Sequence, residues 1–424
     1  MGDVMGRPGK SPLAVLKQRN FLLYWIGQFI SLTGTWMQAL ALSILIQRLD
    51  DSAFALGAVN FASALPPALL LLYSGAVADR RDKRKILIIT QVFFMLAAFA
   101  LAMLVRLNAV QFWHVMAVGA ILGIAQAFDL PANQALVPEL VERDEIPAAV
   151  QLNQAIFHGS RIIGPPIASI LVAAFSLYVA FVANALSFIP VIVTLLVIRS
   201  LRPPEHRPRG GTLDQIKEGY AYVRERPQLL ALLGITAAST VLVFPNLAVL
   251  TIYYVKIVLG GGDTMLGVLM GFSGAGAFLG AMALLIVPAH RRLAHIGMGI
   301  AGMVASLLVM ATAPFVGGKI AGAPMPVILA CFGAALLGAA VSSAMGMVAT
   351  ILQQQTPDAL RGRVMSLHSL VFMGIMPFAS LLMTWVVDLI TMPAELALSA
   401  ILFGLIGAVL FRLLITHSEG IPTV

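Results

Sequence analysis

The sequence predicts an all-α integral membrane protein whose twelve transmembrane helices form two six-helix bundles. Of its 424 residues, 59% are hydrophobic and only 11% are charged, whereas about 25% charged residues is usual for a soluble domain. The hydrophobic residues gather in runs of roughly 20 residues, the length that crosses about 30 Å of hydrocarbon. Six such runs lie on each side of the longest polar segment, 199–228.

The apolar runs define the expected helices in chain order. We expect an amino-terminal bundle in 1–198, a linker in 199–228 and a carboxyl-terminal bundle in 229–424. In the linker, 212–228 has apolar residues at helical spacing, which predicts a short amphipathic helix. The twelve expected spans are 21–47, 53–77, 86–105, 110–136, 147–175, 178–198, 229–257, 265–288, 294–316, 326–352, 365–390 and 393–416.

The basic residues predict the orientation. On this segmentation, 22 of the 27 Lys and Arg residues lie on the side of the two termini and the linker, and four lie on the opposite side. Because Lys and Arg gather in cytoplasmic loops, both termini and the linker are expected in the cytoplasm. This distribution explains the net charge of +8, so we expect no binding of nucleic acid.

A charged motif, GAVADRRDKRK (75–85), follows the second span. Gly75 would allow two helices to approach closely. Asp79, at a helix end, could face the positive N-terminus of a neighbouring helix and pair with Arg80 or Arg84. Such contacts would close the cytoplasmic side in one state. Alternatively, the basic residues serve only as topology signals.

These residues resemble the signature between the second and third helices of the major facilitator superfamily, a Gly, an acid four residues later and further basic residues. Asp82 stands where many members have Gly. The segments 20–38, 52–71, 128–141 and 360–367 look like the branch of enterobactin-exporter-like and drug-efflux-like transporters. The resemblance implies a secondary transporter built from two related halves, with the substrate site between them.

The fifth span contains RIIGPPIAS (161–169). Gly164 and Pro165 match the superfamily's antiporter motif, while Ala168 and Ser169 replace its paired glycines. The match favours an exporter. A helix bend at the proline, with no role in transport, is the alternative interpretation.

Asp129 and Arg161 are the only carboxylate and the only Lys or Arg well inside an expected span. Ionisable groups in hydrocarbon are costly, so each is a candidate site residue. Each belongs to a polar helix face that would turn toward a cavity or another helix. These faces contain Gln126, Asp129 and Asn133 in the fourth span, Gln154, His158 and Arg161 in the fifth, and Gln28 in the first.

The depths of these residues suggest a coupling device. At 1.5 Å per residue, Asp129 lies about 12 Å, His158 about 16 Å and Arg161 about 21 Å from the cytoplasmic end of its helix. Asp129 could bind a proton in one state and release it when Arg161 or His158 approaches. A static ion pair, or an anionic substrate bound by Arg161, is the alternative. In the seventh span, Asn246 follows a proline, which predicts a helix break with free backbone groups.

The sequence contains no GK[ST] phosphate loop, HExxH motif, Cys/His cluster or catalytic constellation, so we expect neither an enzyme nor a bound cofactor or metal. The predicted function is export of an amphipathic small molecule (drug-, siderophore- or lipid-like) by alternating access and proton antiport. We expect a monomer in the plasma (cell inner) membrane, with substrate, protons and membrane lipid as partners. The alternatives are a lysolipid or lipid transporter, an uptake carrier, or a non-transporting receptor with this fold.

Overall fold

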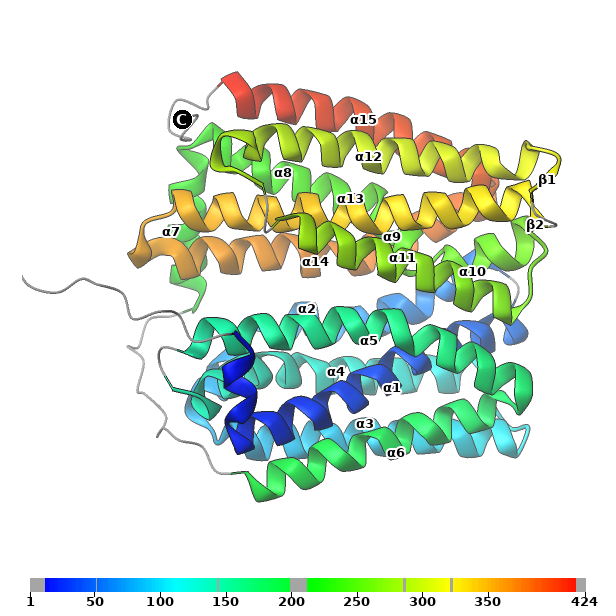
Figure 1. Ribbon diagram of the computed structural model, residues 1–424, viewed down its shortest axis with the longest axis horizontal. Coiled ribbons are helices and arrows are strands. Elements are labelled where there is room, and N and C mark those ends of the chain that lie inside the picture. Colours follow the sequence, from blue (N-terminus) through cyan, green and yellow to red (C-terminus); the bar gives the residue numbers. More distant parts are fainter. Residues whose placement is uncertain are drawn as a thin grey trace, which may run out of the picture.

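The computed structural model describes residues 12–50, 52–142, 145–198, 212–284, 287–320 and 323–416. These residues are nearly all helical (Figure 1). The β-structure among them is a short hairpin, in which the two-residue strand β1 (Lys319–Ile320) pairs antiparallel with the two-residue strand β2 (Ala323–Pro324).

The first half of the chain forms one long helix for each of its six expected spans. Side-chain caps set two of the starts. Ser52 accepts a hydrogen bond from the Ala55 N–H, and Asp82 accepts one from the Arg84 N–H. After the short helix η1 (Pro12–Lys17), the helices are α1 (Arg19–Leu49), α2 (Ala53–Arg80), α3 (Lys83–Arg106), α4 (Phe112–Leu136), η2 (Val137–Leu140), α5 (Ile146–Ala174) and α6 (Leu177–Val197).

The second half begins with α7 (Thr212–Arg224), inside the segment where an amphipathic helix was predicted. This helix packs on α14, and the Tyr222 hydroxyl donates to the Gln355 carbonyl (3.2 Å). The remaining helices are α8 (Pro227–Leu242), α9 (Phe244–Ala248), α10 (Thr251–Tyr253), η4 (Tyr254–Val258), α11 (Asp263–Ala283), η6 (Ala289–Arg291), α12 (Arg292–Thr312), η7 (Ala313–Phe315), α13 (Met325–Gln355), α14 (Asp358–Ile390) and α15 (Met392–Thr416).

The seventh expected span differs from the other eleven. Within the described residues, eleven helices are long and apolar enough to cross a membrane. In place of a continuous helix over 229–257, the structure has α8, α9, α10 and the π-helical segment η4. The break beside Pro245 has a simple cause, since proline lacks the N–H that a continuous helix would use.

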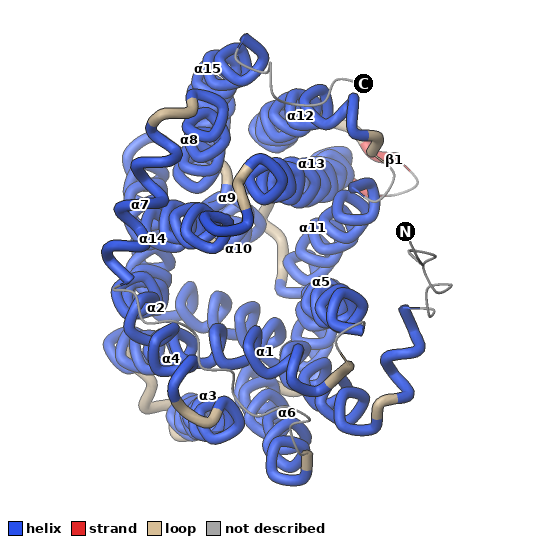
Figure 2. Tube along the Cα trace, turned by 90° about the vertical axis from the view of Figure 1, so that its left-hand side faces the viewer, coloured by secondary structure: helices blue, strands red, loops and turns tan. Residues whose placement is uncertain are grey.

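The helices pack as two groups. Viewed end-on, α1–α6 lie in the lower part and α8–α15 in the upper part (Figure 2). Within each group the packing is extensive, for example of α2 on α4 and of α11 on α13. The most extensive packing between the groups is that of α2 on α14 and of α5 on α11. The domain boundaries stay a prediction, and 199–211 lies outside the described residues.

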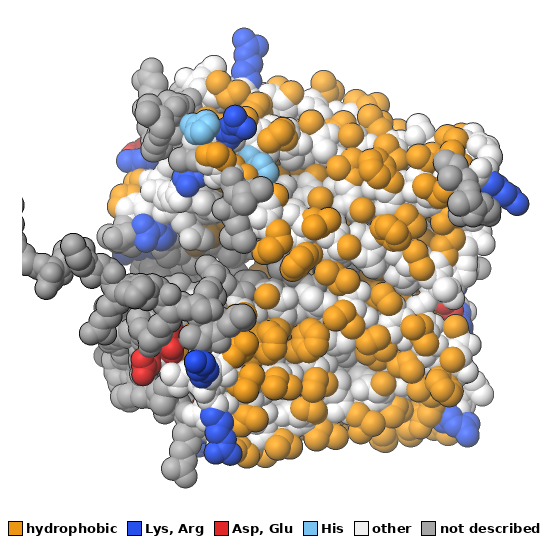
Figure 3. All heavy atoms as spheres, in the orientation of Figure 1, with side chains coloured by type: hydrophobic (Ala, Val, Ile, Leu, Met, Phe, Trp, Pro, Cys, Tyr) orange, Lys and Arg blue, Asp and Glu red, His pale blue; other side chains and the backbone are white. Residues whose placement is uncertain are grey.

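The two ends of the molecule contain different elements. The linker end is the end that holds α7, and the distal end holds the α1–α2 connection and the β1–β2 hairpin (Figure 1). Hydrophobic side chains cover most of the face in Figure 3, while Lys and Arg lie toward the two ends. This distribution fits a bilayer whose hydrocarbon surrounds the middle of the molecule.

Candidate functional site

Asp129 on α4 is the centre of a polar network inside the first half. Its Oδ1 accepts hydrogen bonds from the Thr90 hydroxyl (2.6 Å) and from Gln91 Nε2 (3.0 Å), both on α3. Gln91 Oε1 in turn accepts a bond from the Ser31 hydroxyl on α1 (3.2 Å). These hydrogen bonds therefore connect α1, α3 and α4, and Asp129 is the only charged group that takes part in them.

Unpaired polar atoms on the same two polar faces extend this region. Gln28 on α1 and Asn133 on α4 each have a buried side-chain oxygen with no hydrogen-bond partner, and so does Tyr24 on α1. Burying such an atom without a partner costs about 1–3 kcal/mol. These atoms are thus available for hydrogen bonds with water or a substrate. The side chain of Gln126 is exposed.

Arg161 lies apart from this network. Its half-buried guanidinium is 5.5 Å from the centre of the Trp36 ring on α1, a cation–π contact. Trp36 also packs edge-to-face against Phe157 (5.8 Å between ring centres). The structure does not pair Asp129 with Arg161, so the proposed static ion pair is absent from this conformation. The side chains of Gln154 and His158 lie outside the described residues.

Gly164 allows α5 to lie closely against α1. A Cβ at this position would come within 2.6 Å of the Trp36 Cβ and 2.8 Å of the Thr33 carbonyl oxygen. Pro165 lies inside α5, and the helix continues through it to Ala174. The predicted antiporter motif therefore sits where α5 contacts α1, one turn from Arg161.

The 75–85 motif looks different from its expected arrangement. A Cβ on Gly75 would meet nothing within 4 Å, so the expected close helix approach is absent in this conformation. Arg84 donates from Nε (3.1 Å) and Nη2 (2.8 Å) to the Leu195 carbonyl near the end of α6. It thus satisfies a helix terminus within its own half. The side chains of Asp79 and Arg80 lie outside the described residues.

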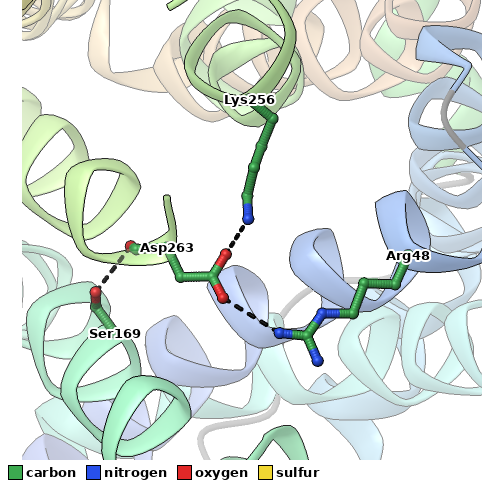
Figure 4. Close-up of polar contacts among 4 residues, drawn as sticks. All are labelled: Arg48, Ser169, Lys256 and Asp263. Atoms are coloured by element: carbon green, nitrogen blue, oxygen red, sulfur yellow. Dashed lines mark hydrogen bonds and ion pairs between the residues drawn. The ribbon is translucent and has the colours of Figure 1, made fainter. Parts of the chain in front are cut away.

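A cluster at the distal end was not predicted from the sequence. Asp263, the first residue of α11, pairs with Arg48 of α1 (3.3 Å) and with Lys256 of η4 (Figure 4). The Ser169 hydroxyl on α5 donates to the Asp263 carbonyl (2.8 Å). Arg48 and Ser169 belong to the first half and Asp263 to the second. The cluster therefore joins the halves through residues that are distant in sequence.

A second distal contact joins α2 to α14. The Asp388 carboxylate accepts hydrogen bonds from the backbone N–H groups of Ala53 (3.0 Å) and Phe54 (2.9 Å) at the start of α2. These are helix N-terminal donors that have no partner within their own helix. One turn further along, a Cβ on Gly57 would overlap the Thr384 side chain. The halves are thus closely packed here.

Asn246 contributes to a separate buried site in the second half. Its Nδ2 donates to the Leu242 carbonyl and to Glu395 Oε1, both at 3.2 Å. Glu395 lies in the first turn of α15 and is fully buried. Asp129 is therefore not the only carboxylate enclosed by the helices. Glu395 was not predicted as a site residue because it is the third residue of the expected span 393–416, and only ionisable residues well inside a span were candidates.

Comparison with known proteins identifies the family. Residues 10–422 match the family model described as transmembrane secretion effector. The chain is 27% identical to the staphyloferrin A transporter of Staphylococcus aureus over 278 residues, 65% of this chain and 68% of the relative. It is 25% identical to the multidrug efflux pump Tap of Mycolicibacterium fortuitum over 414 residues, 94% and 97% of the two chains.

A solved structure agrees with the fold. The crystal structure of a bacterial homologue of the iron transporter ferroportin in an inward-facing state superposes with a TM-score of 0.67 at 18% identity, covering 95% of this chain and 99% of that one. The matched family and its relatives are transporters and not enzymes. The chain therefore belongs to the transmembrane secretion effector family of the major facilitator superfamily and is an integral membrane transporter.

Proposed function

We propose that this transporter exports an amphipathic small molecule by alternating access and that proton antiport drives the export. The excess of Lys and Arg at the linker end supports a cytoplasmic location for that end. In this orientation the halves touch at the outer, distal end and leave open space at the inner one. The conformation would then be the inward-open state, ready to take up cargo from the cytoplasm.

One observation carries the coupling proposal. Asp129 lies among spanning helices, and its hydrogen-bond partners Thr90 and Gln91 are uncharged. Asp129 is half-buried, and a carboxylate withdrawn from water without a cation is costly, so adding a proton lowers that cost. In the opposite state, exposure to water would let the proton leave. Asp129 would therefore carry a proton in exchange for cargo.

Arg161 would contact the cargo in this scheme. Its guanidinium and the rings of Trp36 and Phe157 form a surface that is both cationic and aromatic. Such a surface suits a molecule with a polar or anionic group and an apolar body. A siderophore and varied drugs are the cargoes named for two relatives, and both classes contain amphipathic molecules. A lysophospholipid is the alternative cargo.

Proteoliposomes with an imposed pH gradient test the proposal. Staphyloferrin A, a cationic dye such as ethidium and a lysophospholipid serve as probes for the siderophore, drug and lipid classes. Wild type should move at least one probe and a counterflow of protons. Asp129→Asn keeps an oxygen for Thr90 and Gln91 but removes the charge, so gradient-driven transport should fall at least ~10-fold, as expected when a group acting in proton transfer is lost.

Asp50→Asn is the matched control, because Asp50 is an exposed carboxylate at the end of α1. It should transport like wild type. If Asp129→Asn transported at the wild-type rate with the same pH dependence, Asp129 would not be the coupling residue. Transport of a probe without any proton movement would reject the antiport mechanism itself.

A further inference from the structure

The second half contains a buried acid that the Asp129 mechanism does not use. Glu395 Oε1 accepts hydrogen bonds from the Ser399 hydroxyl (2.6 Å) and from Asn246 Nδ2 (3.2 Å). The other carboxyl oxygen, Oε2, is buried and has no partner. Oε1 of this carboxyl group thus accepts two hydrogen bonds, while Oε2 is able to form a further hydrogen bond or to bind a proton.

The neighbouring amide has a matching free oxygen. Asn246 is 1% exposed, and its Oδ1 also has no partner. An Asn side-chain oxygen accepts hydrogen bonds but cannot donate them, and an ionised carboxylate likewise only accepts. A proton on Glu395 Oε2 would turn that oxygen into a donor. The free acceptor Oδ1 belongs to the residue that already bonds to the same carboxyl group.

No cation among the described residues pairs with Glu395. Nearby, Lys256 of η4 is paired with Asp263, and the Tyr254 hydroxyl donates to the Met310 carbonyl (2.7 Å). Asp388 of α14 is bonded to the start of α2. α8 and α9 contain no ionisable side chain. The other ionisable groups on packed elements are Tyr253 beside Tyr254 and, nearer the linker end, Arg292, His295, Arg361, Arg363, His368 and Arg412.

We propose that Glu395, held by Asn246 and Ser399, is a proton-binding site of the second half that is occupied in this conformation. The proton comes from water and forms an O–H bond at Oε2; on release it returns to water. An ionised carboxylate would be expensive in this enclosed place without a cation. The two bonds to Oε1 and the positive N-terminal end of α15 stabilise the anion, so release remains possible.

The position of the site connects it with the distal end. Asp388, at the end of α14, contacts α2 of the other half, and Glu395 follows it by seven residues. The intervening Thr391 has φ = 108°, and its carbonyl accepts from the Glu395 N–H (3.0 Å). Separation of the halves at the distal end would release the segment between Asp388 and Glu395 from α2. Glu395 would then become accessible to water. The site thus goes beyond the proposed Asp129 coupling and is independent of it.

Infrared spectroscopy of the full-length protein in lipid tests the site with the proton itself as the probe. The C=O stretching band of a protonated carboxyl group should appear in wild type at neutral pH and shift in D₂O. Glu395→Gln keeps an acceptor for Asn246 and Ser399 and should lose the component of this band that belongs to Glu395. Asp129→Asn should retain that component and lose at most one of its own, which separates this proposal from the Asp129 mechanism because neither substrate nor transport is needed.

A second variant keeps the test decisive if Glu395→Gln does not fold. Ser399→Ala removes a hydrogen bond that favours the anion, so the titration midpoint of the band should rise by about one to two pH units. Identical spectra of wild type and Glu395→Gln, or a midpoint unchanged in Ser399→Ala, would overturn the proposal. Loss of the acid band on adding sodium but not choline would also overturn it, because the site would then hold sodium.

Discussion

Helices α2 and α14 belong to opposite halves and meet differently at their two ends. At the distal end, a Cβ on Gly57 of α2 would overlap Thr384 of α14, and Asp388 bonds to the start of α2. At the linker end, a Cβ on Gly75 of α2 or on Gly362 of α14 would meet nothing within 4 Å. The packing beside these glycines is therefore tight at the distal end and open at the linker end.

This difference shows what a change of state would involve. The distal end is held by close packing at Gly57 and by the polar contacts of Asp388 and Arg48. The packing at Gly57 and the contacts of Asp388 are each worth on the order of 1–3 kcal/mol, the range of allosteric coupling free energies, and the exposed Arg48 pair is worth at most about 1 kcal/mol. A transporter must break such contacts repeatedly, so a few modest interactions serve it better than an extensive interface would.

The three predictions that follow use one reporter of distal opening. Cys331 is the single cysteine of the chain and is buried. It is replaced in a Cys331→Ser background, and Ser169→Cys is introduced at the buried distal contact with Asp263. A membrane-impermeant maleimide labels this cysteine only when the distal end opens. The labelling rate therefore measures the open population.

Gly57→Leu should have the largest effect. Its side chain has no room beside Thr384, and overpacking of this kind costs about 1–3 kcal/mol. The cost applies only to the closed distal end, so labelling should rise by roughly 5- to 150-fold. Gly75→Leu is the control, since its side chain enters open space. If both variants were labelled at the same rate, local packing at Gly57 would not hold the distal end closed.

Asp388→Asn should have an intermediate effect. One amide oxygen can still accept, but the NH₂ group then faces a second backbone donor of α2. Loss of a helix N-terminal cap costs about 1–2 kcal/mol, which corresponds to a roughly 5- to 30-fold increase in labelling. Asp50→Asn removes a carboxylate that bonds to Ser52 within the same half, and it should leave labelling unchanged. An equal rise in both variants would contradict an inter-half role for Asp388.

Arg48→Gln should have the smallest effect. The Arg48–Asp263 pair joins the halves, but the Arg48 side chain is 56% exposed, so its contribution is at most about 1 kcal/mol. Labelling should rise by no more than about 5-fold and should depend on salt concentration. Lys256→Gln, which breaks a pair within the second half, is the control. If labelling rose more in Lys256→Gln than in Arg48→Gln, the pair within the second half, and not the Arg48–Asp263 pair, would hold the distal end closed.

Several features of the fold could be predicted from the sequence because they depend on local composition. An apolar run of about 20 residues has few alternatives to a membrane helix. The first six helices accordingly overlap the expected spans, and the proline before Asn246 accounts for the break in the seventh. The polar faces of α1 and α4 could also be predicted, since helical periodicity places Gln28, Asp129 and Asn133 on defined faces.

The partners of these residues could be decided only by the tertiary structure. Depth along a helix suggested Arg161 or His158 for Asp129, but α3 supplies Thr90 and Gln91 instead. Helical spacing tells which residues share a face but not which helix faces them. For the same reason the meeting of Arg48 with Asp263 was not foreseen.

The sequence by itself thus determined the class of the protein, its apolar spans and the residues on their polar faces. Hydrophobic length and local periodicity are sufficient for these properties. Only the tertiary structure decided which end of the molecule is closed, which groups bond to Asp129 and that Glu395 is enclosed with Asn246. Each of these depends on how separate helices are placed against one another, because contacts between distant residues leave no pattern in a single sequence.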